Sequence, residues 1–203
     1  VTKYTFENCT FTQAAAGQYA VTLNATETAY DSRAISYEIT NSVIDTAGRG
    51  INITAGTENE TLGSYMPSIV IRGNMLTLPA EDDSNMAVQL AGNWDSANLT
   101  AGSDPLITVS ENNITAYAAL RINDNMSGNT TDSAKYVMSF EGNILSDGTK
   151  GAVTKSDDTN ETTKAIAEYY DAQLSDPVAE VNGDLYPTLA AAIATAREGE
   201  TVT

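Results

Sequence analysis

The sequence contains no histidine, a single cysteine and only ten lysines and arginines in 203 residues. Without histidine, the chain lacks the side chain that most often titrates near neutral pH and binds metals. Cys9 cannot form an internal disulfide, and we interpret it as a small, partly apolar residue of a strand or corner. No apolar run approaches the ~18 residues of a membrane span, so we expect no membrane insertion.

Basic residues are outnumbered by 27 acidic ones, which gives a formal net charge of −17. An acid excess of this size repels phosphate backbones and anionic membrane surfaces, so neither nucleic acid nor lipid is an expected partner. The sequence has no signal peptide, but it starts at Val1 in the middle of a strand pattern. We therefore expect that the chain derives from a longer precursor.

What the chain does contain is a repeated pattern, which is clearest over residues 35–56. Residues 35–39 alternate apolar and polar side chains, the period-two signature of a strand with one buried face. Two further apolar patches, at 43–44 and 51–53, follow after sharp bends. Three short strands and two corners predict most of one turn of a coil.

Similar segments recur around five asparagines, at intervals of 33, 33, 38 and 31 residues. A period of this length indicates an array of stacked units, and the strand-only pattern fits a parallel β-helix better than leucine-rich or helical repeats. Apolar residues at equivalent positions should stack inside: Ile39, Ile71, Val109 and Phe140. The asparagines should form a structural side-chain ladder: Asn8, Asn41, Asn74, Asn112 and Asn143.

These motifs resemble the right-handed parallel β-helix (pectin-lyase-like) superfamily, whose coils commonly carry an asparagine at one corner. The resemblance covers residues 1–155 and implies an all-β, right-handed solenoid of about five coils. Stacked asparagines can satisfy one another through amide ladders, as they do in other parallel stacks. The resemblance does not imply an enzyme, since many members of this superfamily catalyse nothing.

The connections that follow the third strand of each unit should emerge along one side of a solenoid and form an acidic, polar wall. Three of them carry one aromatic residue each, which predicts either a platform for sugar rings or, alternatively, rings folded back over the sheet. The candidate ligand-binding residues are Tyr30, Tyr65, Trp94, Asp31, Asp95 and Asn98.

Catalysis on this fold would need paired carboxylates, with calcium or a basic residue in some cases. The acid clusters at 81–85 and 156–161 are expected in loops, away from the regular strand faces. Arg72 has no carboxylate in its own strand, and Arg121 should face solvent. We therefore predict no catalytic residue, no metal site and no cofactor.

Beyond residue 155 the pattern becomes helical. Residues 161–174 carry apolar side chains at helical spacing, and the segment 156–176 is predicted to pack on the last coil as an amphipathic helix and linker. Residues 177–203 contain a short strand, a tight turn at Asn182-Gly183, and a helix with Leu189, Ile193 and Ala196 on one face.

This last segment resembles a recurring element of bacterial surface proteins: a strand, Asn-Gly, a Tyr-x-Thr-Leu turn into an alanine-rich helix, and Gly-Glu-Thr-Val. In those proteins the element opens a β-helix by capping its first coil. The resemblance implies that 177–203 is the cap of a following, truncated module of a large, secreted or wall-anchored, adhesin-like protein. Its apolar stripe could also dock head to tail on another copy.

We therefore expect a structural or adhesive module of a modular bacterial cell-surface protein, located outside the cell and without catalytic activity. A carbohydrate-binding module that uses the loop aromatics is the first alternative, and a polysaccharide lyase or hydrolase is the second. The expected partners are glycans or a host or cell-surface protein, together with self-association through 187–203.

Overall fold

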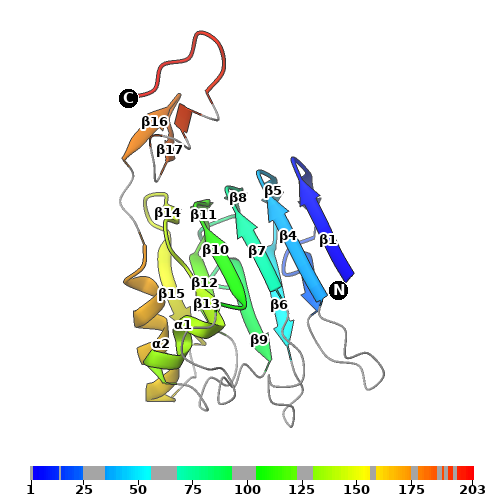
Figure 1. The fold of residues 1–203 in the computed structure, drawn as a ribbon, viewed down its shortest axis with the longest axis vertical. Helices are drawn as coiled ribbons and strands as arrows, with labels where there is room; N and C mark the ends of the chain where they lie inside the picture. Colours follow the sequence, from blue (N-terminus) through cyan, green and yellow to red (C-terminus); the bar gives the residue numbers. More distant parts are fainter. Residues whose placement is uncertain are drawn as a thin grey trace.

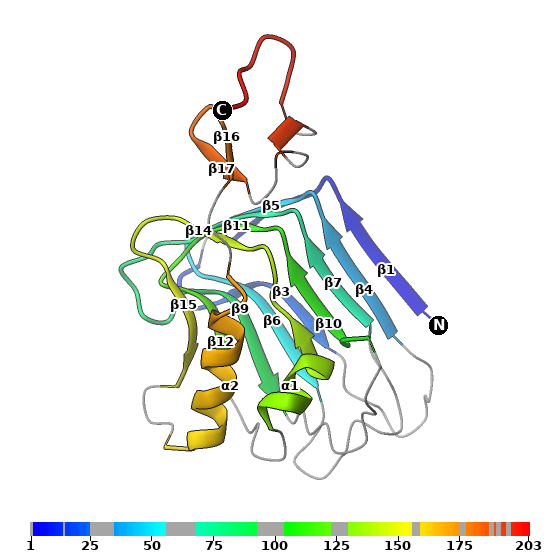
Figure 2. The same cartoon turned by 60° about the vertical axis from the view of Figure 1, so that its left-hand side comes forward.

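The chain forms a parallel β-solenoid whose backbone winds repeatedly through three sheets (Figure 1, Figure 2). Each sheet of this computed structural model holds five strands from successive repeats, and every neighbouring pair in them is parallel. The predicted all-β parallel solenoid is thus confirmed. The structure describes residues 2–13, 15–24, 35–55, 68–92, 104–122, 130–155, 159–174, 178–186, 189, 192–193 and 196–203.

Each repeat contributes one strand to each sheet, in the order A, B, C. Sheet A contains β1 (Thr2–Glu7), β4 (Ile35–Thr40), β7 (Ser68–Arg72), β10 (Ile107–Ser110) and β13 (Met138–Ser139). Sheet B contains β2 (Thr10–Gln13), β5 (Val43–Thr46), β8 (Met75–Thr77), β11 (Asn113–Thr115) and β14 (Ile144–Leu145). Sheet C contains β3 (Tyr19–Asn24), β6 (Arg49–Ala55), β9 (Met86–Gly92), β12 (Ala118–Ile122) and β15 (Lys150–Thr154).

The core is a set of apolar side chains stacked along the solenoid axis. In sheet A, the strand register aligns Ile39 with Ile71 and Ile71 with Val109, and all three are fully buried. Phe140 follows directly after the last paired residue of β13 and is also fully buried. The predicted interior stack is therefore confirmed, and its alternation explains why the period-two pattern was legible in the sequence.

A left-handed backbone corner recurs where each repeat passes from sheet A to sheet B. The corner residue has a positive φ in every repeat: Asn8 (55°), Asn41 (49°), Gly73 (65°), Glu111 (56°) and Gly142 (72°). Glycine and asparagine enter this region at low cost, which explains their frequency here.

Helix α1 (Thr131–Val137) lies in the connection between β12 and β13, where the sequence pattern predicted a polar connection without a helix. The helix begins with a capping box: Thr130 Oγ1 accepts from the backbone N–H of Ser133, and Ser133 Oγ accepts from that of Thr130. Ala134 and Val137 bury its inner face. A seven-residue helix gives too few periodic positions to be recognised in the sequence.

Helix α2 (Glu161–Asp171) closes the solenoid beside β15, as Figure 2 shows. The side chain of Asn160 caps its first turn, and Ile166 and Tyr170 join the main core. Two acceptors near its C-terminal end stand in for a further coil: Asp171 Oδ1 accepts from the N–H of Ala152 at 3.0 Å, and Gln173 Oε1 from that of Phe140 at 2.8 Å. These bonds satisfy strand-edge amides that another strand would otherwise satisfy.

The described residues among 178–203 form a small C-terminal unit outside the solenoid (Figure 1). An antiparallel hairpin of β16 (Ala179–Val181) and β17 (Asp184–Tyr186) turns at Asn182 and Gly183, both with positive φ, as the Asn-Gly pair predicts. Val181 also bridges to Val202, so the unit has its own small cluster of buried residues.

The three residues predicted on one apolar helix face of this C-terminal unit, Leu189, Ile193 and Ala196, differ in their exposure. Ala192 is fully buried in the small cluster and Ala196 packs against it, while Leu189 and Ile193 are exposed at 56% and 59%. No helix among the described residues is long and apolar enough to cross a membrane.

Candidate functional site

The six candidate ligand-binding residues, Tyr30, Tyr65, Trp94, Asp31, Asp95 and Asn98, all lie outside the described residues. The structure does describe where their connections leave the solenoid. Parallel register places the ends of β3, β6 and β9 side by side, with Asn24 opposite Thr54 and Ala55 opposite Gly92. The sugar-ring platform therefore stays a prediction, and its three connections start from neighbouring positions.

A continuous polar ladder runs through the interior beside the corner. Asn74, Asn112 and Asn143 are buried to 2%, 0% and 0% exposure. Asn74 Nδ2 donates to Asn112 Oδ1 at 2.9 Å, and Asn112 Nδ2 donates to Asn143 Oδ1 at 2.8 Å. Each Nδ2 also donates to a backbone carbonyl, namely those of Ile39, Ile71 and Val109.

Asn8 and Asn41 do not belong to this ladder, which corrects the expected membership. Both are exposed corner residues, and the ladder position follows one residue later, at Cys9 and Ser42. Ser42 donates its backbone N–H to Asn74 Oδ1 at 2.9 Å, and Cys9 donates its own to Ser42 Oγ at 3.0 Å. The polar ladder therefore comprises Cys9, Ser42, Asn74, Asn112 and Asn143.

The sequence itself indicates which residues belong to the polar ladder. Every ladder residue stands three positions after the core-facing residue of its repeat, as Asn74 follows Ile71 and Asn112 follows Val109, although Phe6 of the first repeat is only partly buried. Counting from the core residue selects Cys9 and Ser42, whereas searching for asparagine selects their neighbours. Since the asparagine amides of the ladder bond internally, it stabilises the solenoid and offers nothing to a ligand.

The outer face of sheet B carries two rows of side chains along the solenoid axis. One row contains Met75, Asn113 and Ile144, and the strand register places these directly opposite one another. The other row presents hydroxyl groups, from Thr77 and Thr115, with Ser146 Oγ 2.7 Å from Thr115 Oγ1.

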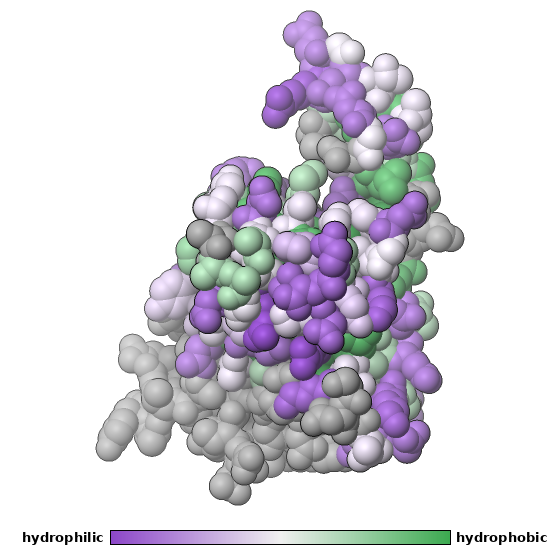
Figure 3. Space-filling model, turned by 180° about the vertical axis from the view of Figure 1, so that it is seen from behind, coloured by the Kyte–Doolittle hydropathy of each residue, from purple (hydrophilic) through white to green (hydrophobic). Residues whose placement is uncertain are grey.

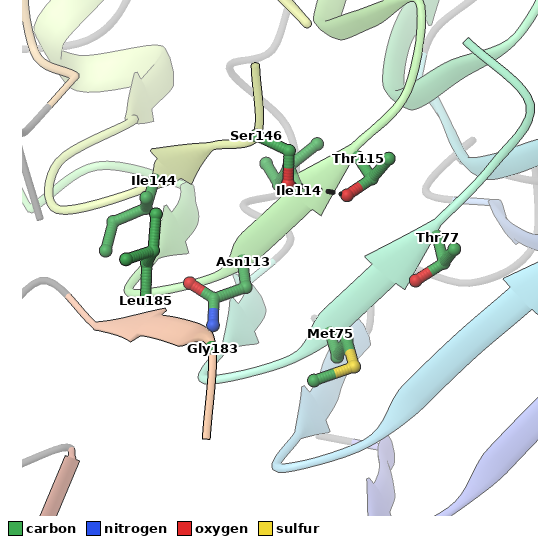
Figure 4. Close-up of a pocket in the computed structure, with 9 residues that line it drawn as sticks. All are labelled: Met75, Thr77, Asn113, Ile114, Thr115, Ile144, Ser146, Gly183 and Leu185. Atoms are coloured by element: carbon green, nitrogen blue, oxygen red, sulfur yellow. Dashed lines mark hydrogen bonds between the residues drawn. The ribbon is translucent and has the colours of Figure 1, made fainter. Parts of the chain in front are cut away.

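The C-terminal hairpin adjoins this face and encloses a groove of ≈ 160 Å³ (Figure 4). Figure 4 shows the amide of Asn113 between the strands of sheet B and the hairpin. The Oδ1 atom of Asn113 is buried and has no hydrogen-bond partner. The face seen in Figure 3 is largely hydrophilic, with apolar side chains near the junction of the two units. The groove is lined by Met75, Thr77, Asn113, Ile114, Thr115, Ile144, Ser146, Gly183 and Leu185.

None of the described residues that line the groove is an acid, a base or an anionic metal ligand. It offers hydroxyl donors and acceptors, one amide and apolar walls, which suit the binding of a neutral polar group. Sequence reasoning missed the groove, because its second wall comes from a hairpin more than thirty residues away along the chain.

The charged residues weighed for catalysis are dispersed. Arg72 pairs with Glu111 of the next repeat at 3.3 Å, although both side chains are largely open to solvent. Arg121 is half-buried, contrary to the expected solvent-facing position; its Nη1 lies 3.9 Å from Met86 Sδ, and its Nε is buried without a partner. Its long side chain lies along the sheet instead of extending into water.

The two groups with shifted pKa values discussed next, Asp82 and Tyr170, do not belong to one site. At the exposed Asp82, hydrogen bonds from the backbone and side chain of Ser84, helped by Arg49, lower the pKa of the carboxyl group. Burial, with a contribution from Tyr169, raises the pKa of Tyr170 far above its ordinary value. In the described part of the chain, no group of three or more Cys, Asp or Glu residues is placed to hold a metal ion.

No protein-family profile, curated protein or solved structure matches the chain. The fold assignment therefore rests on the strand topology described above.

Proposed function

We propose that the chain is a structural or adhesive module of a modular bacterial cell-surface protein, built as a right-handed, pectin-lyase-like β-helix and located outside the cell. The observation that supports this most is the continuity of the interior. Each repeat adds a residue to the apolar stack and one to the polar ladder, so the solenoid forms a self-similar rod. Such one-dimensional architectures serve well as spacers and as surfaces for attachment.

A carbohydrate-binding role through Tyr30, Tyr65 and Trp94 is the second candidate, favoured by the neighbouring starting points of their connections. A glycan array probed with the labelled chain separates the two roles. The structural role predicts no glycan retained above background. A glycan that binds to the chain but not to the Trp94→Ala variant would favour the carbohydrate-binding role. If the chain also releases reducing ends from that glycan, the protein would be a polysaccharide-degrading enzyme.

The cell-surface location has its own test. Antibodies raised against the purified chain should label intact cells of the producing organism, and external protease should remove that label. Labelling only after permeabilisation would refute the location while leaving the solenoid's spacer role open.

Self-association through the C-terminal unit is part of this proposal. Leu189 and Ile193 present adjacent exposed apolar side chains, and at the opposite end Phe6 and Phe11 of the first repeat are only partly buried. A head-to-tail contact between these surfaces would not close, so particle size should grow with concentration. Light scattering of the chain and of the Leu189→Ser/Ile193→Ser double variant tests it; sizes independent of concentration in both would exclude the contact.

A further inference from the structure

We propose that the first repeat is an interaction surface for a second copy of this chain, which binds head to head through antiparallel pairing of the two β1 strands. Strands β1, β2 and β3 stand last in sheets A, B and C, so among the described residues no strand pairs with their outer edges (Figure 1). Unpaired strand edges are templates for pairing with another chain. The head-to-tail contact proposed above would use the same end of the solenoid, and the tests below distinguish the two.

The two ends of the solenoid differ in how they are closed. At the far end, helix α2 packs beside β15, and two of its side chains accept from strand-edge amides. At the first repeat, core-facing aromatic side chains stay partly open instead. Tyr4 aligns with Tyr37, stacks on it with 5.4 Å between the ring centroids and is 47% exposed. Phe6 and Phe11 meet edge to face and are only partly buried, so a second copy would remove further apolar surface from water.

The backbone of β1 determines which of its polar groups face the open edge. Successive residues of a strand direct their N–H and C=O groups alternately to the two sides. The N–H of Asn8 donates to the carbonyl of Thr40 at the end of β4, so the even-numbered residues of β1 bond to β4. Lys3, Thr5 and Glu7 therefore direct their N–H and C=O groups to the open edge.

An antiparallel pair centred on Thr5 matches these free groups. Thr5 would lie opposite Thr5 of the second copy, and Lys3 opposite its Glu7, each as a hydrogen-bonded pair. Tyr4 would lie opposite Phe6 of the second copy on the core-facing side, and aromatic cross-strand pairs of this kind are stabilising. The pairing thus uses every free backbone group from Lys3 to Glu7 and extends the apolar interior across the contact.

Charge also favours this end of the solenoid. Lys3 and Glu7 are the only charged residues between positions 2 and 24, so the first repeat is locally neutral in a chain with a net charge of −17. Two acidic copies repel least where they are locally neutral. Lys3 Nζ lies 2.7 Å from Glu38 Oε1, and its ammonium group has further donors for Glu7 of the second copy.

The oligomeric state of the full chain tests the contact. Analytical ultracentrifugation should show a monomer–dimer equilibrium that does not extend beyond the dimer. Thr5→Pro removes an N–H that points to the open edge and breaks no hydrogen bond of the monomer, so this edge position tolerates proline. It should weaken dimerisation by about tenfold or more, with an unchanged circular dichroism spectrum. Thr5→Ala keeps the N–H, is the matched control, and should dimerise like the parent chain.

A disulfide crosslink tests the orientation of the two copies. In the proposed register the two Thr5 Cα atoms lie about 5.5 Å apart, within the range that a disulfide spans. In a Cys9→Ser background, Thr5→Cys should therefore give disulfide-linked dimers on mild oxidation. The control is Glu38→Cys, which lies beside Thr5 on β4, one strand further from the second copy, and should give none.

Three results would overturn the proposal. They are a monomer at every concentration, equal dimerisation of Thr5→Pro and Thr5→Ala, and no crosslink in Thr5→Cys. Particles that grow beyond the dimer, and that the Leu189→Ser/Ile193→Ser variant abolishes, would also overturn it and would support the head-to-tail contact instead.

Discussion

Ile71 lies directly between Ile39 and Val109 in the register of sheet A, while Val70, one residue earlier, faces the other way. Ile71 is fully buried and Val70 is only half-buried. Ile71 and Val70 therefore lie on opposite faces of the same strand.

Replacing Ile71 by Ala should lower the free energy of unfolding by ~2–5 kcal/mol, because it opens a cavity in the middle of the stack. Val70→Ala is the matched control and should cost about 1 kcal/mol or less, since its methyl groups remain partly hydrated. Denaturant unfolding of both variants measures the difference. Equal losses in the two would show that the strand faces are assigned wrongly.

The α2 cap should control local opening at the end of the solenoid. Asp171→Ala removes the acceptor for the N–H of Ala152, while Asp171→Asn keeps a side-chain carbonyl in its place. Hydrogen exchange at Ala152 should accelerate by about tenfold or more in the alanine variant, and by less in the asparagine variant. Unaltered protection in both variants would mean that Asp171 does not close the edge.

Tyr170 should make stability depend on pH at the alkaline end. Its hydroxyl is buried and donates to the carbonyl of Ala134 at 2.9 Å, and burial raises its pKa. A raised pKa in the folded state means that the contribution is complete below the unfolded tyrosine pKa of about 10 and is lost as pH rises above it.

The expected slope from Tyr170 is a loss of about 1.4 kcal/mol per pH unit above pH ~10. Tyr170→Phe lacks the ionisable group, so its stability should fall less steeply over the same range, even if it is lower at neutral pH. Parallel curves for the two proteins, from denaturant unfolding at each pH, would disprove the linkage.

The fold was predictable because its repeats are regular. Ile39 and Val109 alternate with polar residues, and a period of 31 to 38 residues points to a solenoid. The ladder was harder, since each corner places two small or polar residues side by side, such as Asn41 and Ser42. Only the number of positions from the core residue distinguishes the corner residue with positive φ from the interior ladder residue that follows it.

The groove could not be predicted from local patterns. Asn113 reads as an ordinary outward residue of an alternating strand, and nothing in residues 113–115 indicates that a distant hairpin adjoins them. Helix α1 was not predicted from the sequence for a different reason: its seven residues include only two buried positions, Ala134 and Val137. Docking of distant elements and short capped helices both depend on tertiary context.

A double-mutant cycle on Asn74 and Asn112 tests the interior polar ladder most directly. These two side chains share a hydrogen bond of 2.9 Å, and each also bonds to a backbone carbonyl. Each alanine variant should lose ~1–3 kcal/mol of unfolding free energy, because buried partners are left unsatisfied. The double variant should lose less than the sum of the two, by ~0.5–3 kcal/mol, since the shared bond is broken only once. Losses that add to within ~0.3 kcal/mol, or single losses near zero, would contradict the ladder.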